Sequence, residues 1–319
     1  MKEIIIFCLY LIIIYCLIKN FYSQNKDIEL SDHKVDIIVS LTSTPDRIND
    51  SKKTVLSLLK QSYLPKQIVF NIPYFSSKNV EYKIPEWLIR LSKKYPLIKI
   101  NRCEKDYGPA TKVIPTLFLY KYYPEQKILY IDDDMIYPSN FVKHFYDASL
   151  EHPNDVVCYS GYNIDDYNKN FVQLGPVMIL LLIISIIFLF LTTSFLIFKN
   201  HWKIIIALYT ILFVVLYWFF SSKKREVNIV EGWSGVLVNP SHFNFQTLLD
   251  FEKYPKELFY DDDVYLSGHL TENGIKKYEI KFFGVPLPTF HKNFFKTLSF
   301  TSNSDGENKK IGHSCFKWE

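Results

Sequence analysis

The sequence contains few cysteines, and their positions exclude two common ways of stabilising a small domain. Five cysteines occur in 319 residues, and Cys8 and Cys16 lie in an apolar run near the N-terminus. The other three, Cys103, Cys158 and Cys315, are odd in number, and no two have the spacing of metal ligands. Neither a disulfide framework nor a structural zinc site is therefore expected.

The chain also lacks a basic patch, an internal repeat and a low-complexity linker. It has 37 Lys and Arg against 33 Asp and Glu, and the basic residues are scattered, not interleaved with aromatic ones. This pattern excludes nucleic acid as the expected partner, whereas a small positive net charge suits a surface close to a membrane. Alanine occurs only at Ala110, Ala148 and Ala207, a compositional bias that carries no functional meaning.

Long apolar runs are present three times, over residues 4–18, 177–198 and 204–220. The second and third are separated only by KNHWK and are long enough to cross a bilayer as a helical hairpin. Trp202 and Trp218 lie near their ends, where interfacial aromatics are common. The alternative is a buried hairpin in a protein core, but the apolar character extends around every helical face. Two transmembrane helices are therefore predicted here.

The first run is slightly short for a membrane span, so a cleaved signal peptide competes with an uncleaved anchor. The following residues, KNFYSQNKD, offer no small-residue cleavage site, which favours the anchor. Basic residues near the spans are slightly more numerous on the side of the remaining chain, at Lys19, Lys26, Lys34 and residues 223–225. The prediction is a multi-pass membrane protein with its body on the cytoplasmic side, the lumenal side being the alternative.

The rest of the chain alternates between expected strands and helices. Continuous apolar runs predict buried strands over residues 35–41, 67–73, 97–104, 127–131 and 155–164. Helical spacing predicts helices over residues 51–61, capped by Asn49 or Asp50, then 85–95, 110–123 and 139–152. Later segments look mixed: a strand at 234–240, helices from Ser241 and over 262–273, and a strand at 276–283. Short connections favour a mostly parallel sheet with helices on both faces.

Three consecutive aspartates, Asp132, Asp133 and Asp134, follow directly after the strand at 127–131. Ligands of such sheets bind at the carboxyl ends of the strands. Strand alternation directs Asp132 and Asp134 to one side and Asp133 to the other. Two converging carboxylates repel each other unless a hard cation such as Mg²⁺ or Mn²⁺ joins them, with open positions for a diphosphate. The alternative is a solvated acidic turn in which Asp134 caps the next helix.

Five short motifs in order resemble those of the GT-A glycosyltransferases, specifically family-2-like enzymes. They are VSLTSTPDRI, DYGPATK, the DxD-type DDD, EGWSG and YDDDVYLSGHL, within residues 35–164 and 230–290. The resemblance implies a GT-A (Rossmann-like) α/β fold and a hexosyltransferase-type enzyme (EC 2.4). That enzyme would transfer a sugar from a UDP- or GDP-sugar to a hydroxyl acceptor, with inversion and with Mn²⁺ or Mg²⁺.

Together with the apolar runs, the resemblance divides the chain into four parts. Residues 1–22 would be the anchor, 23–176 the nucleotide-sugar-binding part of the catalytic domain, 177–220 the inserted transmembrane hairpin, and 221–319 the acceptor-side part. Because the hairpin enters on the acceptor side, the acceptor is expected to be lipid-linked or embedded in the membrane, with membrane lipids as further partners.

The resemblance also implies roles for residues on the donor side. Thr42 and Arg47, in the turn after the first strand, would line the nucleotide pocket, and Asp106 would help to hold the nucleoside. Lys112 is placed to meet a phosphate, a role that lysine suits as a point charge, or it is simply an exposed lysine at a helix start. Asp132 and Asp133 would also contact the nucleotide-sugar. Asp132, Asp134 and His291 would bind the metal, and the alternative for His291 is a structural role.

On the acceptor side, the resemblance aligns Asp262 and Asp263 with the family's acidic pair at the start of a helix. Asp263 is the better candidate for the catalytic base that removes the proton of the attacking hydroxyl. The alternative is that Asp261, Asp262 and Asp263 only complement the helix dipole, although a helix needs fewer acids than three. Glu231 and Trp233 in EGWSG would form an acceptor wall, where an indole face stacks on a sugar, unless Trp233 is ordinary core.

Missing motifs narrow the choice among related enzymes. The Gln-x-x-Arg-Trp motif of processive members does not occur, and Gly268–His269 replace an Arg often found after the acidic pair, which argues against a polymer synthase. A nucleotidylyltransferase would need a glycine-rich loop where the chain has TSTPDR. A metal-dependent phosphohydrolase would need clustered histidines, which are scattered here. The second candidate is a non-catalytic membrane protein with a decayed body, although Asp132, Asp134 and Asp263 are all present.

Overall fold

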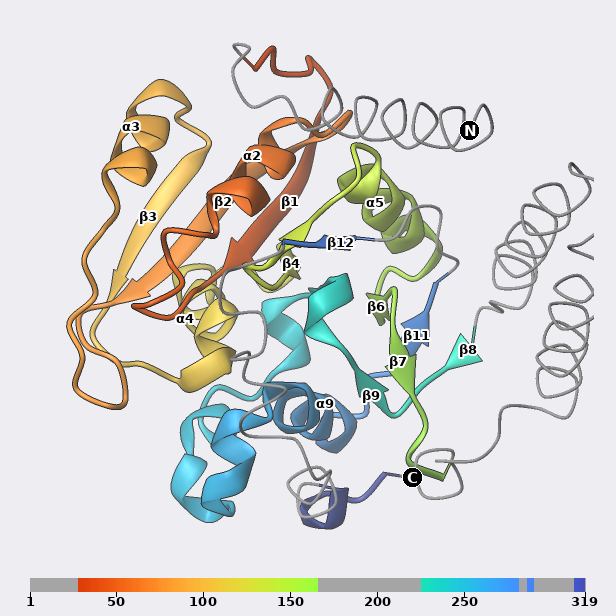
Figure 1. Ribbon diagram of the computed structural model, residues 1–319. Helices are drawn as coiled ribbons and strands as arrows, with labels where there is room; N and C mark the ends of the chain where they lie inside the picture. Colours follow the sequence, from red (N-terminus) through yellow and green to blue (C-terminus); the bar gives the residue numbers. More distant parts are fainter. Residues whose placement is uncertain (1–27, 166–224, 281–285, 290–312, 319) are drawn as a thin grey trace, which may run out of the picture.

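The structure is a computed structural model that describes residues 28–165, 225–280, 286–289 and 313–318. Within these residues, eight strands form one sheet in the order β3-β2-β1-β4-β10-β6-β11-β8 (Figure 1). They are β1 (Lys34–Leu41), β2 (Leu64–Pro73), β3 (Ile98–Cys103), β4 (Lys127–Tyr130), β6 (Val156–Cys158), β8 (Arg225–Glu226), β10 (Val236–Val238) and β11 (Lys277–Glu279). Two further pairs are β5 (Met135–Ile136) with β12 (Leu287–Pro288), and β7 (Gly161–Tyr162) with β9 (Ile229–Val230).

The predicted mixed α/β architecture with a largely parallel sheet is confirmed. Strands β3, β2, β1 and β4 run parallel, and β6 and β11 share their direction. Strand β10 lies antiparallel between β4 and β6, and β8 pairs antiparallel at the edge. Because β1 to β4 are parallel, their carboxyl ends lie at one edge of the sheet, where ligand sites of such folds form.

Helices cover both faces of the sheet, as strand alternation requires. Val35, Ile37 and Val39 of β1 face a cluster with apolar residues of α2 (Lys52–Leu59), α3 (Glu86–Lys94) and α5 (Phe141–Glu151). Ile38 points the opposite way, into a second cluster with α4 (Ile114–Leu119) and α9 (Asp262–Glu272). Both clusters are almost free of solvent contact, so the sheet is buried on two sides, as its continuous apolar strands predict.

Three local predictions need correction. The expected helix from Ser241 is a series of 3₁₀ turns (Pro240–His242, Thr247–Leu249, Phe251–Lys253 and Lys256–Tyr260). Asn244 explains part of this, because its side chain accepts from the Gln246 N–H and competes with helix formation. The strand at 155–164 divides into β6 and β7, and β7 pairs with β9 outside the main sheet. Helix α2 begins after Ser51, so that its N-cap residue is Ser51 and not Asn49 or Asp50.

The predicted multi-pass membrane localisation is contradicted. No helix within the described residues has the length and apolar character needed to span a bilayer. The three apolar runs on which the prediction rested (residues 4–18, 177–198 and 204–220) fall outside the described residues. The predicted anchor (residues 1–22) and inserted hairpin (residues 177–220) lie outside the described residues. The cytoplasmic orientation of the body and a membrane-embedded acceptor have no support in the structure.

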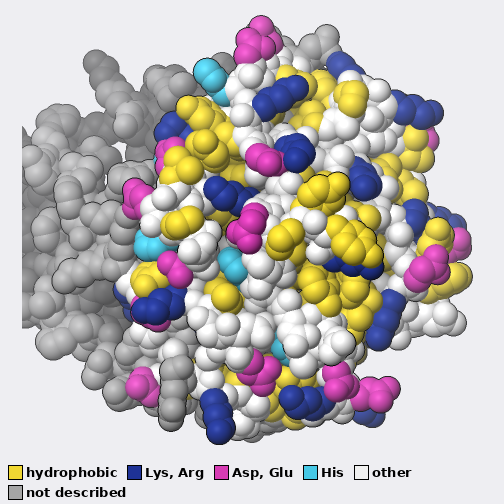
Figure 2. Space-filling view, turned by 180° about the vertical axis from the view of Figure 1, so that it is seen from behind, with side chains coloured by type: hydrophobic (Ala, Val, Ile, Leu, Met, Phe, Trp, Pro, Cys, Tyr) yellow, Lys and Arg dark blue, Asp and Glu magenta, His cyan; other side chains and the backbone are white. Residues whose placement is uncertain are grey.

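The face opposite to that of Figure 1 carries charges of both signs. Figure 2 shows Lys, Arg, Asp and Glu side chains interspersed with patches of apolar side chains over the described part of this face. Neither sign dominates the view, so no strong single-sign field lies there to attract a charged polymer.

Candidate functional site

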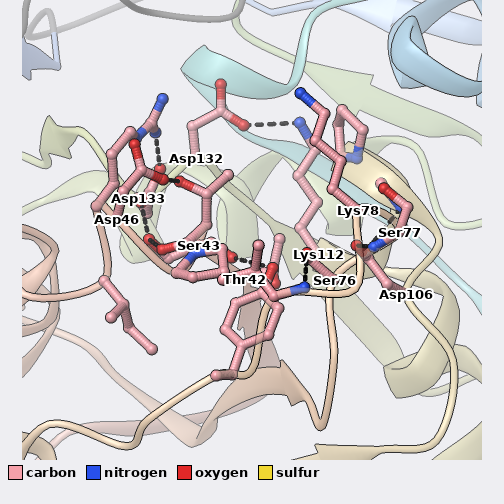
Figure 3. Close-up of a pocket in the computed structure, with 18 of the residues that line it drawn as sticks. Thr42, Ser43, Asp46, Ser76, Ser77, Lys78, Asp106, Lys112, Asp132 and Asp133 are labelled. Atoms are coloured by element: carbon pink, nitrogen blue, oxygen red, sulfur yellow. Dashed lines mark hydrogen bonds and ion pairs between the residues drawn. The ribbon is translucent and has the colours of Figure 1, made fainter.

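A pocket of about 850 Å³ lies at the carboxyl ends of β1, β2, β3 and β4 (Figure 3). Its lining comes from residues 42–49 after β1, 76–83 after β2, 106–112 after β3 and 131–134 after β4, with Tyr260 and Asp262 from the second half of the chain. Because parallel strands end at one edge, segments far apart in the sequence converge here. The pocket therefore contains Thr42, Arg47, Asp106, Lys112, Asp132, Asp133 and Asp134 of the predicted donor-side residues.

Asp133 is fixed by the turn that follows β1. The Arg47 guanidinium pairs with one carboxylate oxygen of Asp133, and the Ser43 hydroxyl donates to the other. Thr54 of α2 donates to the Asp133 carbonyl oxygen at 2.6 Å. Asp133 is only 5% exposed, so its carboxylate braces the turn. Both of its oxygens are thus occupied by protein donors, and Asp133 is a poorer candidate for a direct nucleotide contact than the sequence indicates.

Asp134 lies beside Asp133 but is less well neutralised. Its Oδ2 is 3.5 Å from Arg47 Nη2, which pairs more closely with Asp133. Burial, and then the negative charges of Asp132 and Asp133, raise the pKa of Asp134 to about 6, against the opposing effect of Arg47. The carboxyl groups of this turn therefore repel one another at neutral pH, and an added cation would relieve the repulsion.

Replacing Asp134 is expected to stabilise the metal-free protein. Folding raises the pKa of the Asp134 carboxyl from 3.8 to about 6. As pH increases through that interval, the carboxyl of the unfolded chain loses its proton before that of the folded chain, so the free energy of unfolding falls. Asp134→Asn should raise the free energy of unfolding at pH 7.5 by about 2 kcal/mol and have little effect near pH 4. Urea unfolding in EDTA at both pH values measures this. A variant less stable than wild type at pH 7.5 would show that Asp134 is held by attractive contacts instead.

Lys112 connects the two halves of the site. Its ammonium group is 2.6 Å from Asp132 Oδ1 and 2.8 Å from Asp262 Oδ2, and its side chain is 6% exposed. Burial lowers the pKa of Lys112, but the carboxylates of Asp132, Asp262 and Asp263 together hold it well above its ordinary value. The lysine is therefore charged and buried between carboxylates, and it is not the exposed helix-start lysine of the alternative interpretation.

A polar network beneath the pocket positions Lys112. Ser40 at the end of β1 donates to the Lys112 carbonyl oxygen at 2.5 Å and lies 2.6 Å from the Thr116 hydroxyl. Asn71 of β2 donates to Thr116 at 2.9 Å and accepts from Asn101 of β3. All but Asn101 are fully buried or nearly so, and the network ties three strands to the segment that carries the lysine.

The acidic pair lies at the first turn of α9. Asp261 is the N-cap and accepts from the Val264 N–H, while Asp262 and Asp263 are the first two helical residues. Asp262 lines the pocket and pairs with Lys112. Asp263 lies next to the pocket, and its Oδ1 accepts from the Gly232 N–H at 2.9 Å. Its Oδ2 accepts no hydrogen bond from the described residues.

Gly232 is required where the two halves meet. A Cβ added at this position would lie 2.5 Å from Lys112 Nζ and 3.3 Å from Asp263 Oδ1.

Burial and the neighbouring charge of Asp262 raise the pKa of Asp263 well above its ordinary value, with the charge of Lys112 opposing this rise. A carboxyl with a raised pKa is a stronger base once ionised, as general base catalysis requires.

Asp106 organises two loops. Its Oδ1 accepts from the Gly108 N–H at 2.9 Å and from the Thr111 hydroxyl at 3.0 Å, and its Oδ2 accepts from the Ser77 N–H at 2.7 Å. Gly108 has φ +60°, a conformation that favours glycine. Thr42 donates its hydroxyl proton to the Asn71 carbonyl oxygen. Thr42 and Asp106, which were both predicted as nucleotide contacts, therefore line the pocket and also hold its backbone segments in place.

The predicted acceptor residues, Glu231 and Trp233, flank Gly232, whose N–H donates to Asp263. Glu231 accepts a hydrogen bond from Ser160 through its carboxylate, and Trp233 is half-buried against the first apolar cluster. The Trp233 carbonyl oxygen accepts from Tyr137, whose hydroxyl also lies 3.3 Å from the Asp132 carbonyl oxygen. Neither Glu231 nor Trp233 lines the pocket. His291 lies outside the described residues.

The sequence did not single out several residues that shape this site. They are Ser43, Tyr82 and Tyr137, which hold the turns, and Ser76, Ser77 and Lys78, which form part of the lining. Residues 74–83, YFSSKNVEYK, look like any polar connection, and only their position after a buried strand indicates a site. On α9, His269 is packed against Tyr254, Tyr265 and Phe316, so this part of the helix faces away from the pocket.

The carboxylates near the strand ends suit a divalent cation only with help from a ligand. No group of three or more His, Cys, Asp or Glu side chains in the described part of the chain is arranged to hold a metal ion. Asp132 and Asp134 supply oxygen donors, and burial together with the charges of Asp132 and Asp133 raises the pKa of Asp134. Two protein oxygens fit Mg²⁺ or Mn²⁺, which often complete their shells with phosphate oxygens and water.

Fold and site together define an α/β protein with a charged ligand pocket at the carboxyl ends of parallel strands. No protein-family model matches the sequence, and no curated protein matches it. Among solved structures, S. aureus TarS 1-349 in complex with UDP is similar, with 12% identity, TM-score 0.43 and coverage of 80% of this chain and 61% of that chain. The TarS complex with UDP-GlcNAc has 18% identity, TM-score 0.29 and coverage of 41% and 35%.

The mannosyltransferase PcManGT from Pyrobaculum calidifontis, in complex with GDP-Man and Mn²⁺, has 13% identity, TM-score 0.30 and coverage of 49% of this chain and 45% of that chain. The chain thus spans between about a third and three fifths of the lengths of these structures. The TM-scores of these three structures are all below 0.5.

Proposed function

We propose that this protein is a glycosyltransferase that moves a sugar from a nucleotide-sugar to a hydroxyl acceptor, with inversion and with a divalent metal. The observation that carries the proposal is the convergence of Asp132, Asp134, Lys112 and Asp262 at one end of the 850 Å³ pocket, with Asp263 just beyond. The pocket is large enough for a nucleoside and its diphosphate. Its inner end combines carboxylates for a metal with a carboxylate suited to proton abstraction.

The nucleoside is assigned to the outer pocket between the turn at 42–47 and the loop at Asp106. The diphosphate then points toward Asp132 and Asp134, which would hold Mn²⁺ or Mg²⁺. Bound there, the metal would neutralise the charge of the departing diphosphate. The four carboxyl groups of Asp132, Asp134, Asp262 and Asp263 outnumber the cations Lys112 and Arg47 beside them, so a diphosphate needs added cationic charge to bind here.

The acceptor hydroxyl is assigned to the side of Asp263, opposite to the leaving diphosphate. Asp263 Oδ2 accepts the hydroxyl proton as the oxygen attacks the anomeric carbon and the bond from that carbon to the diphosphate breaks. The Gly232 N–H holds Oδ1 and so fixes the orientation of the carboxylate. Asp262, which pairs with Lys112, positions this turn and is the weaker candidate for the base. Glu231 and Trp233 are proposed as a wall of the acceptor side.

Donor hydrolysis tests the proposal. The purified full chain should hydrolyse one class within a panel of UDP-, GDP- and CMP-sugars in Mn²⁺ and not in EDTA. Asp134→Asn should lower this turnover by about a hundredfold or more, because charge stabilisation at the leaving group is lost. Asp147→Asn is the matched control, since Asp147 lies on α5, pairs with Lys143 and does not line the pocket. A chain that neither turns over nor binds any donor would support the decayed, non-catalytic body instead.

A further inference from the structure

The chain after β2 forms a short hairpin that the proposed chemistry does not use. Phe75 and Glu81 form an antiparallel bridge. The Ser76 N–H donates to the Val80 carbonyl oxygen at 2.8 Å, and the Tyr82 N–H donates to the Tyr74 carbonyl oxygen at 3.0 Å. We call residues 74–82 the β2 hairpin. Its tip holds Lys78 and Asn79, the latter with φ +59° as a tight turn requires.

Two hydrogen bonds fix the β2 hairpin to the pocket. The Ser77 N–H, next to the tip, donates to Asp106 Oδ2 at 2.7 Å, and the Tyr82 hydroxyl, at the base, donates to the Ser43 carbonyl oxygen at 3.0 Å. Tyr82 is buried. The hairpin therefore stands as one side of the pocket, held at both ends by the segments that follow β1 and β3.

The hairpin also supplies a cation that forms no ion pair with any residue that the structure describes. Four cationic side chains line the pocket. Arg47 is paired with Asp133 and Asp134, and Lys112 with Asp132 and Asp262. Lys78 and Lys83 form no ion pair with any described residue. In the view of Figure 3 the Lys78 side chain extends toward the same end of the pocket as that of Lys112, where Asp132 lies.

We propose that Lys78 at the tip of the β2 hairpin is a donor-binding residue that contacts the diphosphate of the bound nucleotide. The proposal rests on the proposed function, because it assumes that a nucleoside diphosphate occupies this pocket. Arg47 and Lys112 are held by carboxylates and supply little net positive charge to an incoming anion. Lys78 lines the pocket and forms no ion pair with any described residue, and an ammonium on a flexible stem suits a phosphate as a point charge.

Calorimetric binding of UDP and GDP, and of uridine and guanosine, to the full chain in Mn²⁺ tests this. Lys78→Gln should weaken binding of the preferred diphosphate about five- to tenfold, the effect of losing one exposed charge contact. Binding of the matching nucleoside, which has no phosphate, should change less than about twofold. Lys78→Arg should stay within about twofold of wild type for both ligands, since the charge remains.

Lys83→Gln is the matched control, because Lys83 lines the same rim and its loss changes the net charge equally. An equal weakening in Lys83→Gln would overturn the proposal, since it would show a general field effect. Unchanged diphosphate binding in Lys78→Gln would also overturn it, while leaving the proposed function intact. A wild-type chain that binds no nucleotide at all would overturn both. Weakening that is confined to Lys78→Gln and the diphosphate, and that shrinks in high salt, would establish the contact.

Discussion

Asp263→Asn should lower donor turnover with acceptor by about a thousandfold, within the range that positioned general bases contribute. The reason is local: Asp263 has one oxygen held by the Gly232 N–H and one that accepts from no described residue. Asparagine keeps the shape and can still accept from Gly232, but it cannot take the proton of the attacking hydroxyl. Because Asp263 lies outside the pocket lining, the affinity for the nucleotide should change less than about twofold.

Steady-state kinetics and calorimetry on the same preparations measure the two effects. Asp261→Asn is the matched control: asparagine is a good N-cap, so the bond to the Val264 N–H survives while one negative charge is lost. The control should retain most of its turnover. If all three aspartates serve only the helix dipole, both variants would show equal, small losses of stability and no selective loss of turnover. That result would remove Asp263 from the chemistry.

The apolar pattern of the sequence predicted the fold better than it predicted where individual helices and strands begin and end. Runs such as VDIIVSL and KILYI are buried on both faces, and such runs can only be central strands covered on two sides. The antiparallel β10 between β4 and β6 could not be derived, because a three-residue strand carries no information about its direction. The turns at 240–260 were mistaken for a helix because local side-chain bonds, such as that of Asn244, do not disturb the apolar pattern.

The carboxylates of the site could be placed from the sequence, whereas their partners could not. Asp133 pairs with Arg47 and Ser43, and Asp132 with Lys112, as strand alternation predicts. Asp134, which was predicted on the side of Asp132, instead shares Arg47 with Asp133. The pairing of Lys112 with Asp262 joins residues 150 positions apart, and nothing in either motif indicates it. The β2 hairpin was missed for a related reason: its role depends on Asp106 and Ser43, which lie in other segments.

The membrane prediction failed for a different reason. It rested on apolar runs and their flanking tryptophans, in stretches that fall outside the described residues, and no described helix is long and apolar enough to span a bilayer. The motifs that carry the site lie in the alternating part of the chain and are independent of that prediction. The proposed chemistry therefore stands on the pocket and its carboxylates, whatever acceptor they serve.

Lys112→Met should destabilise the protein by about 3–5 kcal/mol, the usual cost of leaving buried carboxylates without their cation. Asp132 and Asp262 would lose contacts of 2.6 and 2.8 Å, and Asp263 would lose the charge that opposes the rise of its pKa. Lys112→Arg keeps the charge, but a guanidinium is bulkier than the ammonium group, which already lies so close to Gly232 that an added Cβ would be 2.5 Å away. We therefore expect arginine to restore only part of the stability.

A double-mutant cycle separates this ion pair from simple loss of packing. Asp262→Asn in the Lys112→Met background should recover about 1–3 kcal/mol, because one unpaired charge disappears with it. Lowering the pH should narrow the gap between Lys112→Met and wild type, since protonated carboxyls need no cation. Urea unfolding followed by circular dichroism at pH 7.5 and pH 5 gives both quantities. A single mutant as stable as wild type, or a double mutant with additive losses, would mean that Lys112 does not hold the two halves of the site together.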